Sequence, residues 1–402
     1  MAWGMERPVR VRFTGTRVEM AGLLLRGFAL LVPTIGLYRF WLTTWKRRFY
    51  WGHTEIDGDP LEYTGNAHQL LLGFLMALAV FVPLYGLFIY LSTLATGAAI
   101  IGYGGVGVLV WFLMGYAIYR ARDFRLSRTL WRGIRFDQAG NAWLYALRRF
   151  LWSLLVLVTA GLAYPLMAAN LWSYRYRHSW YGDRAFGFAG HWKQLAGPYY
   201  LCWFLGAIIV VAGLTLGAGM GAFPEGSTPD PAGFGPIVIA GLLIGALHLF
   251  YRSRELTRMF SSVRLGEARL AVTIRTRSLI GQYLLFALAL AGALLALLVG
   301  GLVVLGAVAS DAFADGGFDL GIFMQHLQQS MVVLLAIVFG YLLILAAFTF
   351  VAELFLGLAF WKLVAGNATV TGLDSLRDVR ARGEDGALAG EGLADALNVG
   401  SY

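Results

Sequence analysis

Two histidines occupy equivalent places in two similar polar stretches of an otherwise apolar chain. His53 begins the stretch HTEIDGDPLEYTG, and His178 begins HSWYGDRAFGFAG. Converging imidazoles could hold a metal ion, whereas structural hydrogen bonding at an interface is the simpler alternative. The six histidines show no close zinc spacing, and no Ser–His–Asp set, carboxylate pair or activated cysteine stands out. We therefore expect no metal, no cofactor and no enzymatic activity, and we keep both histidines as candidate functional residues.

One carboxylate lies inside a long apolar segment. Glu353, in FVAELFLGLAFWK, precedes Lys362 by nine residues, which is about 13 Å along a helix. A carboxylate at membrane depth is a candidate functional group and needs a polar partner. We predict that Glu353 contacts Arg26 or a glutamine; the alternative is that its segment projects into the membrane interface.

Two further apolar segments, 18–44 and 143–171, are each interrupted near the middle by Thr, Gly and Pro, which favour a break in a helix. The breaks are in register, because a shift of 125 positions carries the first onto the second. The same shift carries His53 onto His178. A gap-free match that includes Gly, His and Gln predicts an internal duplication. The candidate functional residues at the two breaks are Thr34, Gly36, Thr159 and Gly161.

The elements that must position these residues are membrane helices. Of 402 residues, 58% are hydrophobic and 14% are charged, against about 25% charged in average soluble domains. Six apolar segments reach the length of a bilayer-spanning helix, which is about 20 residues. They are residues 68–92, 98–119, 199–221, 234–252, 279–305 and 332–361. The fold class predicted is an α-helical polytopic membrane protein.

The distribution of charge predicts the topology. Lys and Arg are absent from residues 67–119, 198–251 and 278–361, so the positive-inside rule places every polar unit and both termini in the cytoplasm. The segments 18–44 and 143–171 would then enter and leave on the same side as re-entrant or in-plane elements; eight full spans is the alternative. The net charge of +9 indicates anionic lipid head groups at the cytoplasmic face, and not nucleic acid, as partners.

The polar stretches resemble short β-hairpins. Residues 53–65 and 178–190 place turn residues between strand-like runs, and weaker relatives occur at 129–136, 263–272 and 367–376. Since an isolated hairpin is marginal in water, we predict that these units pair with one another. The predicted divisions are a first repeat at 1–140, a second at 141–277, a third span pair with its β unit at 278–373, and a cytoplasmic tail at 374–402.

Several of these stretches resemble a known family. The motifs FTG, TIGLYRFW, KRRFYW and GDPLEY occur in that order between residues 13 and 63, and GEGLADALNVG lies near the C-terminus. They resemble the YjgN family of bacterial inner-membrane proteins, which carry a domain of unknown function. The resemblance implies an inner-membrane location and supplies no catalytic or ligand residues.

Two classes of function are compatible with these features. Duplication and broken helices favour transport or permeation of a solute, because transporters often place their sites at such breaks. The scarcity of ionisable groups inside the spans favours a non-transporting scaffold or lipid-binding protein that organises the inner membrane. These features favour transport slightly, and either class is compatible with a homo-oligomer.

Overall fold

The computed structural model describes residues 8–94, 96–224, 228–308, 319–322, 324 and 331–382. The chain forms two compact units. The barrel unit comprises Met1–Gly15, Leu37–Thr276 and Leu363–Tyr402, and the helical unit comprises Thr16–Gly36 and Arg277–Lys362. The division into two repeats, a third span pair and a tail stays a prediction.

Six helices in the described part of the chain are long and apolar enough to cross a membrane, which is consistent with a helical membrane protein. The candidate spans are Ala67–Leu91, Gly104–Ser127, Trp192–Gly219, Pro231–Phe260, Thr276–Val304 and Ile337–Gly366. Three helices continue past the ends of the predicted apolar segments, at 119, 252 and 361, where basic residues begin. The helices continue past these points, because Lys and Arg are good helix formers and a helix need not end where its apolar stretch does.

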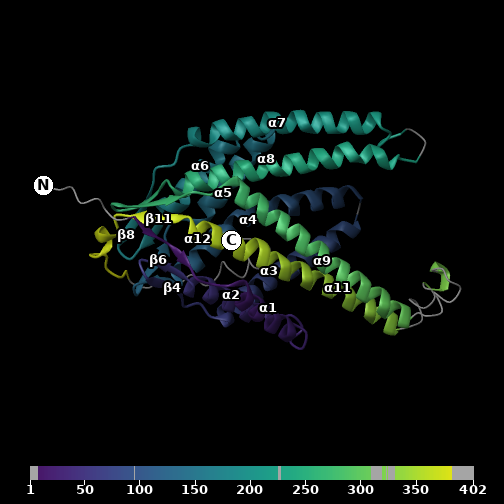
Figure 1. Ribbon diagram of the computed structural model, residues 1–402, viewed down its shortest axis with the longest axis horizontal. Helices are drawn as coiled ribbons and strands as arrows, with labels where there is room; N and C mark the ends of the chain where they lie inside the picture. Colours follow the sequence, from purple (N-terminus) through teal and green to yellow (C-terminus); the bar gives the residue numbers. More distant parts are fainter. Residues whose placement is uncertain are drawn as a thin grey trace. The chain divides into compact units, whose positions relative to one another are not determined.

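The spans of the barrel unit come as helix pairs. The first pair is α3 (Ala67–Leu94) and α4 (Thr96–Ser127), and the second is α7 (Trp192–Gly219) and α8 (Phe234–Phe260). Figure 1 shows α7 and α8 side by side, leading away from the strands of this unit. Their close approach depends on a small residue: a Cβ on Gly213 would meet the carbonyl oxygen of Pro236 at 3.3 Å.

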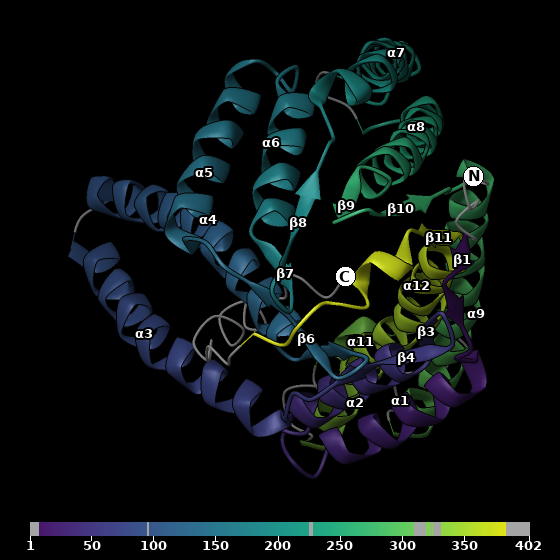
Figure 2. The same cartoon turned by 90° about the vertical axis from the view of Figure 1, so that its left-hand side faces the viewer.

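The two interrupted segments form shorter helices. The first gives α1 (Arg17–Leu31) and α2 (Arg39–Gly52), and the second gives α5 (Ala142–Val158) and α6 (Tyr164–Arg177). At 17 residues the longest, α5, is about 26 Å long, less than the ~30 Å of a hydrocarbon core. Helices α5 and α6 pack side by side (Figure 2).

The polar stretches form one antiparallel sheet of eleven short strands. They are β1 (Val9–Arg10), β2 (Arg12–Phe13), β3 (Thr54–Ile56), β4 (Asp59–Tyr63), β5 (Thr129–Trp131), β6 (Ile134–Gln138), β7 (Ser179–Tyr181), β8 (Arg184–Phe188), β9 (Val263–Leu265), β10 (Ala268–Val272) and β11 (Ala368–Thr371). Each hairpin pairs with the next along the chain, and the spatial order runs β1-β11-β10-β9-β8-β7-β6-β5-β4-β3-β2.

The two ends of this order are joined by the chain itself. Only Val11 separates β1 from β2, and its N–H donates to the carbonyl of Ala368 at 3.0 Å. The sheet is therefore a closed barrel, which leaves no free edge. Strand pairing also fixes where the interrupted segments begin and end. The first segment connects β2 to its partner β3, and the second connects β6 to its partner β7. Each segment thus starts and finishes at adjacent strands of one barrel.

Two-residue turns set the register of the first hairpins. Asp57 and Gly58 both have positive φ, at 57° and 84°, and Arg132 and Gly133 follow with 52° and 72°. Positive φ at both central residues is the signature of the type I′ turn, whose twist matches that of paired strands. Arg132 also bridges the two hairpins, since its guanidinium lies 2.8 Å from a carboxylate oxygen of Asp57.

The interior of the barrel is filled. Trp131, Tyr181 and Leu265 are buried there together with Leu376 and Val379. The last two belong to the segment 373–382, which begins with the 3₁₀ turn η4 (Leu373–Leu376). We call residues 373–382 the plug. Because apolar side chains from the strands and the plug pack together, the barrel interior is a hydrophobic core.

The helical unit contains α1, α9 (Thr276–Val308), α11 (Met331–Ala352), a π-helical segment η3 (Glu353–Gly357) and most of α12 (Leu358–Gly366). Aromatic and polar contacts hold these helices together. The rings of Phe28 and Phe350 lie 6.4 Å apart, and the guanidinium of Arg17 lies 5.0 Å from the ring centre of Phe355. Gln282 donates its side-chain N–H to the Ala359 carbonyl at 2.8 Å.

Candidate functional site

The break between α5 and α6 is a sharp turn with an internal cap. The Thr159 hydroxyl donates to the Leu155 carbonyl at 2.7 Å. Ala160 and Gly161 then adopt positive φ, at 49° and 96°, and the Gly161 N–H donates to the carbonyl of Val156 at 2.7 Å. This left-handed ending closes the helix as a glycine C-cap does.

Side chains of α7 bind the carbonyl groups that this break releases. Trp203 donates its indole N–H to Ala160 at 2.8 Å. The Tyr199 hydroxyl donates to Gly161 at 2.8 Å, and the Tyr200 hydroxyl donates to Leu162 at 3.1 Å. Three successive carbonyls are therefore satisfied by protein donors.

The break after α1 has the same local geometry 125 positions earlier. The Thr34 hydroxyl donates to the Leu30 carbonyl at 2.7 Å, and the Gly36 N–H donates to the Leu31 carbonyl at 2.8 Å. Ile35 and Gly36 have φ values of 50° and 82°. Each of these features has its counterpart at Leu155, Val156, Thr159, Ala160 and Gly161.

Both breaks expose apolar side chains at their tips. Val32 and Ile35 are 73% and 94% exposed, and Leu157 and Val158 are 71% and 82% exposed. Because the polar groups of a break can be satisfied by its own threonine and by a neighbouring helix, the apolar side chains are free to point outward.

The two candidate histidines end helices. His53 is the C-cap of α2 and His178 the C-cap of α6. Their Nδ1 atoms lie 2.8 and 2.7 Å from the carbonyls of Phe49 and Tyr174, and each imidazole is 4.3 Å from the same residue's ring. This geometry is that of structural hydrogen bonding. Within the described residues, no group of three His, Cys, Asp or Glu side chains could hold a metal ion.

Glu353 is buried, with 7% of its surface exposed, and it begins the π-helical segment η3. Sequence patterns gave no sign of this segment, although π-bulges are frequent at functional sites. The contact of Glu353 with Arg26 or a glutamine stays a prediction.

Comparison with protein families identifies the chain. The model of a family described as bacterial protein of unknown function (DUF898) matches residues 8–396. The chain belongs to the DUF898 family. This is the YjgN-family domain that the N-terminal motifs indicated, so that prediction is confirmed. No curated protein and no solved structure shows significant similarity to the chain. An activity for this DUF898 protein must therefore be argued from its own geometry.

Sequence reasoning missed one repeated motif of this DUF898 chain. The pattern Tyr-Arg-x-Arg-acid occurs at 119–123 and, 132 positions later, at 251–255. Its carboxylates, Asp123 and Glu255, are 6% and 3% exposed, and each forms an ion pair with the arginine three residues earlier, at 2.9 and 3.1 Å. The recurrence of this five-residue pattern in the sequence was the signal that could have identified these ion pairs. Such ion pairs hold a conformation in place, since removing the arginine leaves a buried carboxylate uncompensated.

Proposed function

We propose that this chain is a non-enzymatic inner-membrane protein that organises lipid, with the elements α1–α2 and α5–α6 entering only the cytoplasmic leaflet. The observation that supports it is the capping of the second break. The carbonyls of Ala160, Gly161 and Leu162 all receive donors from α7. Each of them is thus already engaged by a donor from the protein, which makes it less available to a solute.

A transporter would use such a break differently. In discontinuous transport helices, freed backbone groups coordinate the substrate or its coupling ion. The capped carbonyls and the apolar barrel interior both favour the lipid-organising function over transport, which the sequence favoured. Transport remains the second candidate because of the duplication, which is supported by equivalent hydrogen bonds at an offset of 125 residues.

Helix length and exposure support entry into one leaflet. Helix α6 has 14 residues and is about 21 Å long, and both breaks carry exposed apolar side chains such as Ile35 and Val158. A single leaflet contributes about half of the ~30 Å hydrocarbon core, so the apolar tips can lie in one leaflet while the polar ends of these helices stay in the interface. The barrel and both termini would then lie in the cytoplasm, where the basic clusters belong.

The test uses single cysteines in a Cys202→Ser background, in oriented vesicles. Cysteines replacing Ile35 and Val158 should resist a membrane-impermeant thiol reagent from both faces, and spin labels there should report hydrocarbon depth. Cysteines replacing Arg10 and Gly52 should react from the same face. Labelling of Thr159 or Gly161 positions by the soluble reagent would indicate a water-filled path and favour transport. Reaction of positions 10 and 52 from opposite faces would show that residues 18–44 span the membrane and would favour the eight-span alternative.

A further inference from the structure

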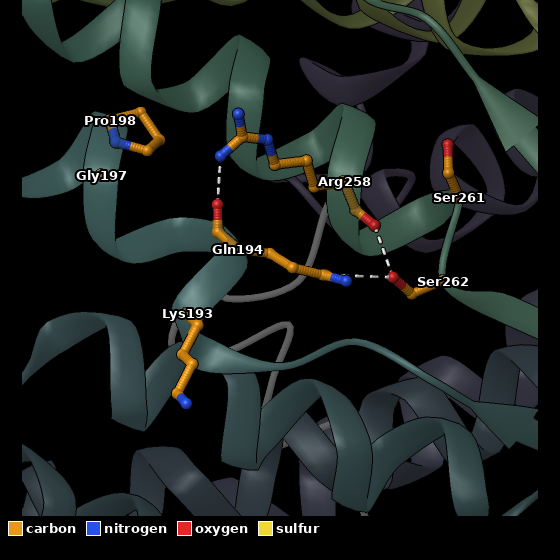
Figure 3. A pocket seen from close by; sticks show the side chains of 7 residues that line it. All are labelled: Lys193, Gln194, Gly197, Pro198, Arg258, Ser261 and Ser262. Carbon is orange, nitrogen blue, oxygen red and sulfur yellow. Dashed lines mark hydrogen bonds between the residues drawn. The ribbon is translucent and has the colours of Figure 1, made fainter.

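An open groove lies where α7 begins and α8 ends (Figure 3). It encloses about 590 Å³ and opens to the surface. Its lining residues are Lys193, Gln194, Gly197, Pro198, Arg258, Ser261 and Ser262. None of these is acidic, and two are basic, so the groove suits an anion.

A proline inside α7 explains why Arg258 is held in this groove. Pro198 has no N–H, so the carbonyl of Gln194, four residues earlier, lacks its helical donor. The Arg258 guanidinium donates to that carbonyl instead, as Figure 3 shows. Arg258 is thereby fixed at the groove, which is the pre-organisation that anion binding requires.

The serines fix the rim of the groove. The Ser261 hydroxyl accepts from the Val272 N–H at 3.0 Å and donates to the Val272 carbonyl at 3.2 Å. The Ser262 hydroxyl donates to the Arg258 carbonyl at 2.7 Å. Both side chains therefore hold the end of α8. The two basic residues of the lining are Arg258, whose guanidinium lies at the Gln194 carbonyl, and Lys193, whose ammonium Figure 3 shows turned away from Arg258.

The electrostatic setting adds to the positive charge. Lys193 lies in the first turn of the 28-residue helix α7, where the helix dipole favours anions. The nearest carboxylate along α8, Glu255, is buried and paired with Arg252. Its charge is therefore compensated and does not oppose an anion at Arg258.

We propose that this groove binds the phosphate group of an anionic membrane lipid; the assignment of a lipid source rests on the proposed lipid-organising function. The groove lies at the beginning of one candidate span, Trp192–Gly219, and at the end of another, Pro231–Phe260, which is the depth of lipid head groups. Below it, α7 exposes Leu201, Phe204 and Ile208, whose spacing puts them on one helix face, where acyl chains would lie. A free phosphate shares the head-group chemistry, and the experiment separates the two sources.

The experiment measures phosphatidylglycerol binding to the full chain in phosphatidylcholine nanodiscs by native mass spectrometry. Lys193→Gln removes one charged donor without touching the α7 cap and should lower the affinity about tenfold. Arg258→Gln is made in a Pro198→Ala background, where the restored backbone N–H satisfies Gln194, and it should cause a similar loss. Arg254→Gln is the matched control, because Arg254 lies on α8 outside the groove and contacts Phe250.

The outcomes separate the possible sources. Loss of phosphatidylglycerol binding in the groove variants, with Arg254→Gln unchanged, supports the lipid site. If inorganic phosphate binds the protein in pure phosphatidylcholine discs and Lys193→Gln abolishes that binding, the groove is a phosphate site whose ligand is soluble and not a lipid. Equal effects of all three charge changes, or no effect of any, would overturn the proposal. Because this readout is independent of labelling at the breaks, failure of the groove and failure of the leaflet proposal are distinguishable.

Discussion

At the scale of single residues, the two breaks offer a comparison between matched glycines. Gly36 and Gly161 have similar positive φ, so alanine at either should cost about 1 kcal/mol of backbone strain. A Cβ at Gly161 would also lie 3.1 Å from the Trp203 indole nitrogen and 3.2 Å from the Tyr199 hydroxyl, whereas nothing lies within 4 Å at Gly36. We therefore predict that Gly161→Ala lowers the thermal unfolding temperature more than Gly36→Ala. The control is Gly206→Ala in α7, where a Cβ would meet nothing within 4 Å, and it should not lower the unfolding temperature. If Gly36→Ala and Gly161→Ala lower the unfolding temperature equally, Tyr199 and Trp203 do not pack against the second break.

Tyr181 in the barrel core gives a residue-scale prediction about pH. Burial raises the pKa of its phenol to about 12, and its hydroxyl donates to the Trp131 carbonyl at 3.0 Å. Because the folded pKa exceeds the unfolded value of about 10, this stabilisation is complete below pH ~10 and is lost as the pH rises towards 12. The difference in tyrosinate absorbance between the wild type and Tyr181→Phe should titrate near 12. A difference titration near 10 would mean that the ring is solvated.

At the scale of elements, the contact of α7 with the α5–α6 break is the one that should be most sensitive to mutation. Tyr199→Phe and Trp203→Phe each remove a donor to a break carbonyl, and the loss of one such hydrogen bond typically costs about 0.5–1.5 kcal/mol. We expect both variants to unfold at lower denaturant concentration in the same nanodiscs. Thr215→Val is the control, since that hydroxyl bonds within its own helix. If all three variants unfold alike, the α7 caps do not stabilise the break.

The helices and their breaks could be predicted because their signals are local. Apolar length marks the spans, and Thr-x-Gly-Leu marks both turns. The caps could not be predicted, because Trp203 follows Ala160 by 43 positions and an aromatic residue in an apolar segment equally indicates lipid contact. His53 and His178 were recognised as equivalent, but their role as helix C-caps depends on carbonyl positions that only the folded helix defines.

At the scale of the barrel as a whole, closure depends on contacts between distant parts of the chain. The β units were visible as a strand–Gly–strand rhythm, but the closing strands β1 and β2 have two residues each, too few for any periodic pattern. Val9 pairs with Val370 across nearly the full chain. The register between strands so far apart in the chain is set by the other strands and by the plug. The sequence therefore predicted paired hairpins but not their closure into a barrel.

The plug can be tested at one glycine of the barrel. Gly182 lies in the β7–β8 turn, and a Cβ there would overlap the carbonyl oxygen of Arg380 and approach Val379 to 2.8 Å. The plug is tied at this point, because the Asp183 N–H donates to the same Arg380 carbonyl at 3.0 Å. Overpacking of this kind typically costs about 1–3 kcal/mol. Gly182→Ala should therefore displace residues 373–382 and expose them to protease.

The matched control lies five residues further along the same hairpin. A Cβ on Gly187 would approach its nearest neighbour, the Cβ of Arg264, only to 3.8 Å, which is ordinary contact. Gly187→Ala should leave the plug protected while making the same chemical change in the same β-hairpin. The measurement is the rate of limited proteolysis within residues 373–382, followed by mass spectrometry of the fragments. Equal protection in both variants would show that the plug does not pack against Gly182, and equal sensitivity would show that its release is a general consequence of altering this hairpin. Proteolysis of the plug in Gly182→Ala alone would establish that the plug closes the apolar interior of the barrel, because Leu376 and Val379 leave the core together with the plug.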